Sequence, residues 1–103
     1  MDRETLYRRT LALWGEQAQY DQAVEECAEL CAALMHYRRG KIAIEQVVDE
    51  LADVTLMVGQ LSWMFGEDKV REAVERKRAK LEQLMAEESG ANGAAETGSG
   101  EKG

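Results

Sequence analysis

Two groups of carboxylate residues interrupt otherwise apolar, helix-forming segments of this chain. The first group reads EECAE and the second reads DELAD. Residues three positions apart lie on the same face of an α-helix, so Glu26 pairs with Glu29, and Glu50 pairs with Asp53. Like charges beside an apolar face are costly unless something neutralises them. Mg²⁺ prefers oxygen ligands, so the sequence predicts a metal site formed by these four carboxylates.

The sequence around both groups lacks basic residues. There is no Lys or Arg from position 10 to 37 or from position 42 to 68. A solvated helix face usually mixes both signs, with a basic residue about one turn from an acid. That mixture is present after position 68, which makes a solvated surface the weaker interpretation of the two acidic groups. A di-iron site needs Glu-x-x-His pairs, and the single histidine, His36, fits neither group.

The composition predicts an all-α fold. The chain has 103 residues, no proline, and many Ala, Leu, Glu, Gln, Met and Arg, which favour helices. Glycines at positions 15, 40 and 66 mark three expected helix ends. We therefore expect four helices, at about 4–13, from 17 or 21 to 39, at 44–65 and at 67–85.

The short link at Gly40 and Lys41 predicts that the second and third helices form an antiparallel hairpin. Glu29 lies eleven positions before Gly40, and Glu50 and Asp53 lie ten and thirteen positions after it. At about 1.5 Å of rise per residue, the two acidic pairs should therefore lie at similar heights.

The folding unit is expected to span residues 1–86. Segment 87–103 holds five of the nine glycines and no large apolar residue, so we expect a disordered Gly/Ser/Glu-rich tail. A unit of this size buries a limited core. The expected helix 44–65 is apolar around much of its circumference, which predicts a homo-oligomer, at least a dimer.

Charge and cysteine content indicate the setting in which the chain acts. The net charge of −7 argues against binding to nucleic acid or to an acidic membrane surface. We find no signal peptide and no apolar run long enough to span a membrane. Cys27 and Cys31 are expected to be small buried thiols in a reducing compartment, so we expect a cytoplasmic protein.

The two acidic motifs and their flanks resemble the MazG-like, all-α nucleoside triphosphate pyrophosphohydrolases. The pattern E-E-x-x-E is followed by E-x-x-D, with W-G-x-x-x-Q before it and the run ERKRAKL in the last expected helix. The resemblance covers residues 6–84. It implies Mg²⁺-dependent hydrolysis of a nucleoside triphosphate to the monophosphate and pyrophosphate, with Mn²⁺ as an alternative ion. It also implies dimers or tetramers in which helices from two subunits complete the bundle.

The same resemblance assigns roles to the acidic residues. Metal ligation falls to Glu26, Glu29, Glu50 and Asp53. Glu25 beside them is implied as a further ligand or as a base that orients the attacking water.

A carboxylate site needs cations to attract a polyphosphate. Lys77 and Lys80 lie three positions apart in the last expected helix and are the candidates for phosphate contacts. The alternative for this basic run is an ordinary solvated helix face.

The sequence gives weaker evidence for the residues that contact the nucleobase than for the metal ligands. Trp14, and after it Trp63, are candidates for stacking on the base, although large aromatics at helix ends more often lie in a core or an interface. Gln19 or Gln22 is a candidate for hydrogen bonds to its edge. Met57 and Gln60 continue the helix face of the second acidic pair and are candidates for the floor of the pocket.

These observations lead to one main expectation and two alternatives. We expect a pyrophosphohydrolase that acts on a nucleoside triphosphate and serves nucleotide-pool housekeeping. Within the enzyme class, phosphoribosyl-ATP or a deoxynucleotide such as dCTP or dUTP are alternative substrates. The alternative from another class is a non-catalytic helical module that uses the same scaffold for oligomerisation or for binding a partner.

Overall fold

The computed structural model describes residues 1–95, with side chains up to residue 90. This part of the chain consists of three helices and no strand: α1 (Arg3–Arg38), α2 (Ile44–Phe65) and α3 (Glu67–Ala95). The expectation of an all-α fold is confirmed. The chain divides into two compact units, Met1–Glu67 and Asp68–Gly103, and each is described by itself.

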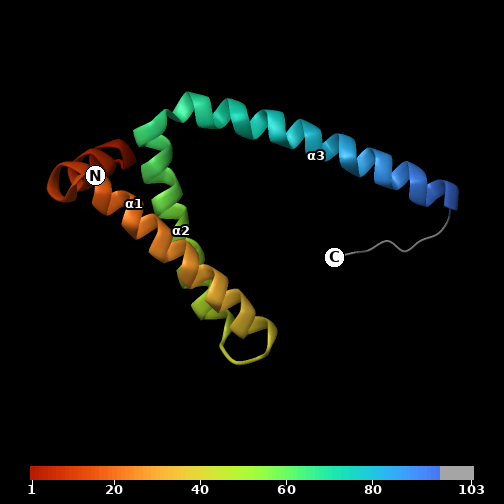
Figure 1. Ribbon diagram of the computed structural model, residues 1–103, viewed down its shortest axis with the longest axis horizontal. Coiled ribbons are helices and arrows are strands. Elements are labelled where there is room, and N and C mark those ends of the chain that lie inside the picture. Colours follow the sequence, from red (N-terminus) through yellow and green to blue (C-terminus); the bar gives the residue numbers. More distant parts are fainter. Residues whose placement is uncertain (96–103) are drawn as a thin grey trace. The chain divides into compact units, whose positions relative to one another are not determined.

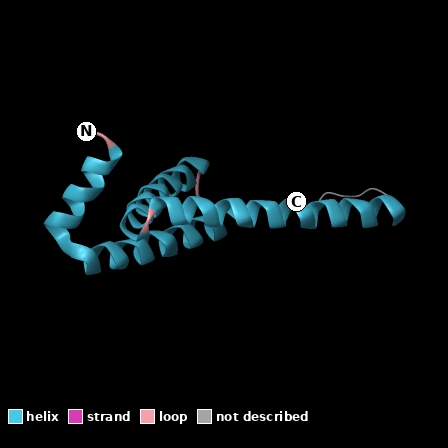
Figure 2. Cartoon of the chain, turned by 90° about the horizontal axis from the view of Figure 1, so that it is seen from above, coloured by secondary structure: helices cyan, strands magenta, loops and turns pink. Residues whose placement is uncertain are grey.

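Helix α1 joins the first two helices that the sequence predicts. Asp2 caps its start, because the Asp2 carboxylate accepts a hydrogen bond from the Thr5 backbone N–H at 2.8 Å. Gly15 is the only residue inside α1 with a non-helical backbone (φ 87°, ψ 170°), and the helix bends there (Figure 2). The non-helical Gly15 lies at the boundary that the sequence predicts between its first two helices, and both segments belong to the single bent helix α1. The described residues therefore hold three helices in place of the expected four.

Helices α1 and α2 lie side by side as an antiparallel hairpin (Figure 1), as predicted. Gly40 has a positive φ of 74° just past the end of α1. Its N–H donates to the Tyr37 carbonyl at 2.9 Å, and the Lys41 N–H donates to the His36 carbonyl at 2.9 Å. This pair of bonds satisfies two carbonyls at the helix end. The chain can then turn back within five residues, and α2 begins at Ile44.

A buried polar network connects the segment before the kink to α2. Tyr7 and Gln60 are each only 4% exposed. Gln60 Nε2 donates to the Tyr7 carbonyl at 3.0 Å, and the Thr10 hydroxyl donates to Gln60 Oε1 at 2.8 Å. Gly59 packs directly against the Tyr7 side chain, at a place where a Cβ atom would overlap the Tyr7 hydroxyl. These contacts hold the bent N-terminal segment of α1 against α2.

Helix α3 follows Gly66 and ends at Ala95, later than the expected end near residue 85. Its exposed ion pairs join residues one turn apart, such as Arg71 with Asp68 and Arg78 with Glu75. The segment 87–95 holds three Ala and two Glu, which favour a helix, together with two Gly, which do not, and no proline to stop the helix. The expected tail, 87–103, therefore overlaps α3 in its first nine residues, and its last eight lie outside the described residues.

The cysteines and the lengths of the apolar segments can also be compared with the expectations from the sequence. Cys27 and Cys31 are both exposed and unpaired by disulfides, which corrects the expectation of buried thiols. Both lie on α1 at positions that α2 does not cover. Among the described residues, no helix combines the length and the apolar character that a membrane span requires.

Candidate metal centre and adjoining pocket

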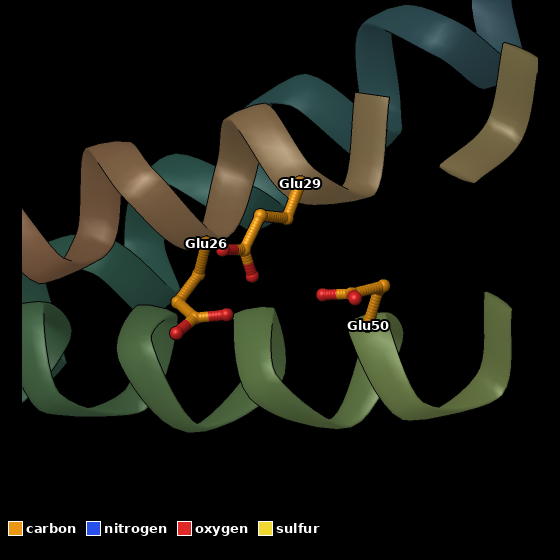
Figure 3. Close-up of side chains that lie close together, drawn as sticks. All are labelled: Glu26, Glu29 and Glu50. Atoms are coloured by element: carbon orange, nitrogen blue, oxygen red, sulfur yellow. The ribbon is translucent and has the colours of Figure 1, made fainter. Parts of the chain in front are cut away.

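Three of the predicted metal ligands converge between α1 and α2. Glu26 and Glu29 extend from α1 and Glu50 extends from α2, and their carboxylates point toward one another (Figure 3). Each contributes an oxygen atom that lies within 4.8 Å of the oxygens of the other two. The hairpin register predicted by counting from Gly40 is thereby confirmed for these residues, which we call the acidic cluster.

The acidic cluster has no compensating positive charge within the described part of the chain. None of its three carboxylates forms an ion pair with Lys, Arg or His there. Glu26 Oε1 and Glu50 Oε1 are buried without a hydrogen-bond partner. Buried polar atoms nearly always have a partner, and leaving a charged one unpaired is costly. These two atoms therefore mark a place where a cation would remove an existing penalty.

Electrostatic repulsion within the cluster is visible at Glu29. The neighbouring Glu26 carboxylate raises the pKa of Glu29 above its ordinary value, and partial desolvation and the charge of Glu50 raise this pKa further. The charge of Glu25 acts in the same direction. A raised carboxyl pKa means that added positive charge, as a proton or a metal ion, is favoured at this position. Carboxylate oxygens are the hard ligands that Mg²⁺ and Mn²⁺ accept.

The two other predicted acidic residues lie outside this group. Asp53 is exposed one turn beyond Glu50 on α2, and it is not among the carboxylates that approach within 4.8 Å. Its side chain is one methylene shorter than that of glutamate, which limits its reach across the hairpin. Glu25 is exposed beside Glu26. Metal ligation by Asp53 and a catalytic role for Glu25 stay predictions.

A pocket of about 600 Å³ lies in the same unit of the chain. Five of the six candidates for contacts to a nucleobase line it, and they are Trp14, Gln19, Gln22, Met57 and Gln60. The sixth, Trp63, is not in the lining, and its ring packs against that of Tyr7 with the centroids 6.4 Å apart. Trp14 is 66% exposed, so its indole is available for stacking, whereas Gln19 is only 6% exposed. The mainly apolar lining with a few polar groups is typical of a small-molecule site.

The sequence did not single out all of the lining residues. Tyr7 and Thr10 also contribute to the pocket, together with Leu6, Ala18 and Leu56. Tyr7, Thr10 and Trp14 are spaced by three and four positions, so they share one face of α1. From this spacing, the sequence could have predicted that these three residues line one surface together. Their packing against Gln60, fifty or more positions away, could not be inferred from it.

The pocket and the acidic cluster are connected by one side chain. Gln22 lines the pocket, and its Nε2 atom donates a hydrogen bond to Glu26 Oε2 at 2.6 Å. Gln19 Nε2 donates to the Thr10 carbonyl at 3.4 Å, which orients the Gln19 amide in the wall of the pocket.

The predicted phosphate contacts lie on α3. Lys77 and Lys80 are exposed there, in the unit Asp68–Gly103. The neighbouring Arg78 pairs with Glu75 and Glu82. Contact of either lysine with a phosphate stays a prediction.

Comparisons of the chain with models of protein families, with curated proteins and with solved structures found no match. The functional assignment of the site therefore rests on its residues and their geometry.

Proposed function

We propose that this protein is a Mg²⁺-dependent hydrolase that converts a nucleoside triphosphate into the monophosphate and pyrophosphate. The observation that carries the proposal is the convergence of Glu26, Glu29 and Glu50, with two of their oxygens buried and unpartnered. Glu29 is exposed and Glu26 and Glu50 are half-buried, and a cation held by all three would offset the repulsion among them.

The reaction needs neutralisation of the polyphosphate charge, a positioned water molecule and a stabilised leaving group. Mg²⁺ would supply the positive charge when bound, and the three residues of the acidic cluster would hold it, with Asp53 as a further ligand. Glu25 is suited to orient the attacking water by accepting a hydrogen bond from it. The water oxygen forms a bond to phosphorus as the bond between the α- and β-phosphates breaks, and pyrophosphate leaves.

Substrate binding is assigned to the pocket and to two basic residues. The base would stack on Trp14, with the amide of Gln19 hydrogen-bonded to its edge. Lys77 and Lys80 would contact the phosphates and offset the negative charge of the chain.

We also propose that the protein acts as a homo-oligomer, a dimer or a tetramer. Several large apolar side chains of α2 are exposed in the single chain, and they are Ile44, Val48, Leu51, Val58 and Phe65. Their spacing places them on one side of the helix, and a contiguous apolar surface of this kind usually marks an interface. We assign the protein to nucleotide-pool housekeeping in the cytoplasm, with no nucleic acid or membrane as a partner.

A panel of nucleoside triphosphates and phosphoribosyl-ATP tests the enzymatic proposal. Each compound is incubated with the full chain, in Mg²⁺ and in EDTA, and pyrophosphate is measured. Release with at least one compound, in Mg²⁺ only, is the expected result. Turnover of phosphoribosyl-ATP alone would reassign the substrate.

The exposed apolar surface of α2 favours one other function. A non-catalytic helical module that oligomerises, or that binds a partner through this surface, would show the same exposed side chains. Such a module would release no pyrophosphate from any compound in the panel.

A further inference from the structure

Gln22 belongs both to the pocket and to the surroundings of the acidic cluster. Its side chain lines the pocket, while its amide nitrogen donates to Glu26. The two residues are four positions apart on α1, so the helix itself places one side chain above the other. Within the described chain, Gln22 is the pocket residue that hydrogen-bonds directly to a cluster carboxylate.

This hydrogen bond distinguishes the two oxygens of Glu26. Oε2 accepts it from Gln22, and Oε1 is the buried atom without a partner. A bond to a charged carboxylate is short and comparatively strong, so it restricts rotation of the Glu26 side chain. Gln22 is itself exposed, and its side-chain oxygen Oε1 makes no hydrogen bond within the described residues. A ligand in the pocket can therefore reach Gln22 and limit its motion.

We propose, on the basis of the proposed function, that Gln22 is a positioning residue that couples the pocket to the acidic cluster. A nucleoside in the pocket orders Gln22, Gln22 orders Glu26, and the cluster then binds a divalent cation more tightly. Because coupling between two binding sites is reciprocal, the cation also raises the affinity for the nucleoside by the same factor. One hydrogen bond of ordinary net strength supplies a factor of roughly 2 to 10.

Calorimetric titration of the full chain with Mn²⁺ measures this coupling. The titration is run with Mn²⁺ alone and then in the presence of adenosine, guanosine, cytidine or uridine, each tested singly. These nucleosides carry no phosphate to ligate the ion, so an effect on Mn²⁺ affinity must pass through the protein. The expected result is that at least one nucleoside tightens Mn²⁺ binding by roughly 2- to 10-fold.

Two substitutions isolate Gln22. Gln22→Met keeps the length and helix propensity of the side chain but cannot donate to Glu26. Gln22→Leu also keeps the helix propensity and cannot donate, and its side chain is shorter and branched. Gln83→Met is the matched control, because Gln83 Nε2 donates to Glu87 at 3.4 Å with the same four-residue spacing on α3. Both Gln22 variants should bind Mn²⁺ roughly 2- to 10-fold more weakly and lose the nucleoside effect. The control should retain both properties.

The outcomes separate this inference from the proposed function. If the wild-type chain binds no Mn²⁺, the acidic cluster is not a metal site and both proposals are wrong. If the wild type binds Mn²⁺ and the Gln22 variants bind it with the same affinity and the same nucleoside response, Gln22 does not couple the two sites. The proposed function would then stand without it. Helical circular dichroism of each variant confirms that the comparison is made between folded proteins.

Discussion

Individual carboxylates account for the chemistry proposed here. Glu26 and Glu50 lie on different helices, and each keeps one buried oxygen without a partner. Glu29 completes the group, and repulsion from Glu26 raises its pKa. In the absence of a cation these residues oppose the packing of α1 on α2, so binding of a cation should be visible as a gain in stability.

Glu50→Gln tests this gain at one residue. In the wild type, Mg²⁺ at a hundred times its dissociation constant should stabilise the folded state by about 2.7 kcal/mol, because only the folded protein presents the cluster. The variant should lose most of this effect, since Glu50 is the residue of α2 whose carboxylate approaches those of Glu26 and Glu29. Thermal unfolding in Mg²⁺ and in EDTA measures the difference. An unchanged response in the variant would remove Glu50 from the site.

Glu29→Gln tests the repulsion in the absence of metal. The raised pKa means that the folded protein binds a proton at Glu29 more tightly than the unfolded chain does. Stability should therefore fall as the pH rises through the folded pKa, and recover as the pH falls toward the ordinary value of 4.5. In EDTA, the variant should melt above the wild type at pH 7, and this advantage should shrink toward pH 4.5.

A substitution in the other unit of the chain provides the control for that experiment. Glu72 is exposed on α3, so Glu72→Gln should show no comparable pH-dependent advantage. An advantage for Glu29→Gln that is independent of pH would show that charge repulsion is not its cause.

At the scale of helices, the hairpin and the interruption at Gly15 could be predicted, and the joining of the two segments into one bent helix could not. Gly40 and the distances of Glu29 and Glu50 from it were sufficient to place the two acidic residues opposite each other. Gly15 was ambiguous, because a glycine can end a helix or kink one, and the choice depends on packing after the bend. The separation of Asp53 from the cluster depends on side-chain reach between the helices. Residue spacing alone does not encode that reach.

The contact between the bent segment and α2 depends on Gly59. A Cβ atom there would overlap the Tyr7 hydroxyl, and Tyr7 is too deeply buried to move freely. Gly59→Ala should therefore destabilise the fold by about 1–3 kcal/mol through overpacking, which outweighs the gain of about 0.5–1 kcal/mol from replacing a helical glycine. Chemical denaturation measures the change in the free energy of unfolding.

Gly90→Ala is the matched control for this substitution. Nothing lies within 4 Å of the position that its Cβ atom would occupy in α3, so a small stabilisation or no change is expected. Adding Tyr7→Phe to Gly59→Ala should recover part of the lost stability, because it removes the atom closest to the new methyl group. A stable Gly59→Ala protein would show that the close approach is unimportant.

At the scale of the whole molecule, little apolar surface is buried within one chain. The described apolar residues that are buried are few, and they are Tyr7, Ala23, Ala33 and Val47. A small unit with so limited a core usually needs additional packing to be stable. A second copy of the chain could supply this packing by covering the exposed apolar side chains of α2.

We therefore expect light scattering at micromolar concentration to show a dimer or a tetramer. Leu51→Glu should shift the assembly toward the monomer, because it places a charge on the exposed apolar surface of α2. Arg9→Glu also changes the charge at an exposed position but lies on α1, where no apolar side chain is lost. A wild-type chain that is a stable monomer would contradict the expected assembly.

The central claim is that the acidic cluster supports hydrolysis of a nucleoside triphosphate. The most direct test is to measure Mg²⁺-dependent pyrophosphate release by the wild type and by Glu26→Gln, with Glu72→Gln as the control. Glu26→Gln removes the charge of a ligand while keeping its shape, so turnover should be lost even at high Mg²⁺ concentration, whereas Glu72→Gln should remain active. Pyrophosphate release by Glu26→Gln at the wild-type rate would contradict the account.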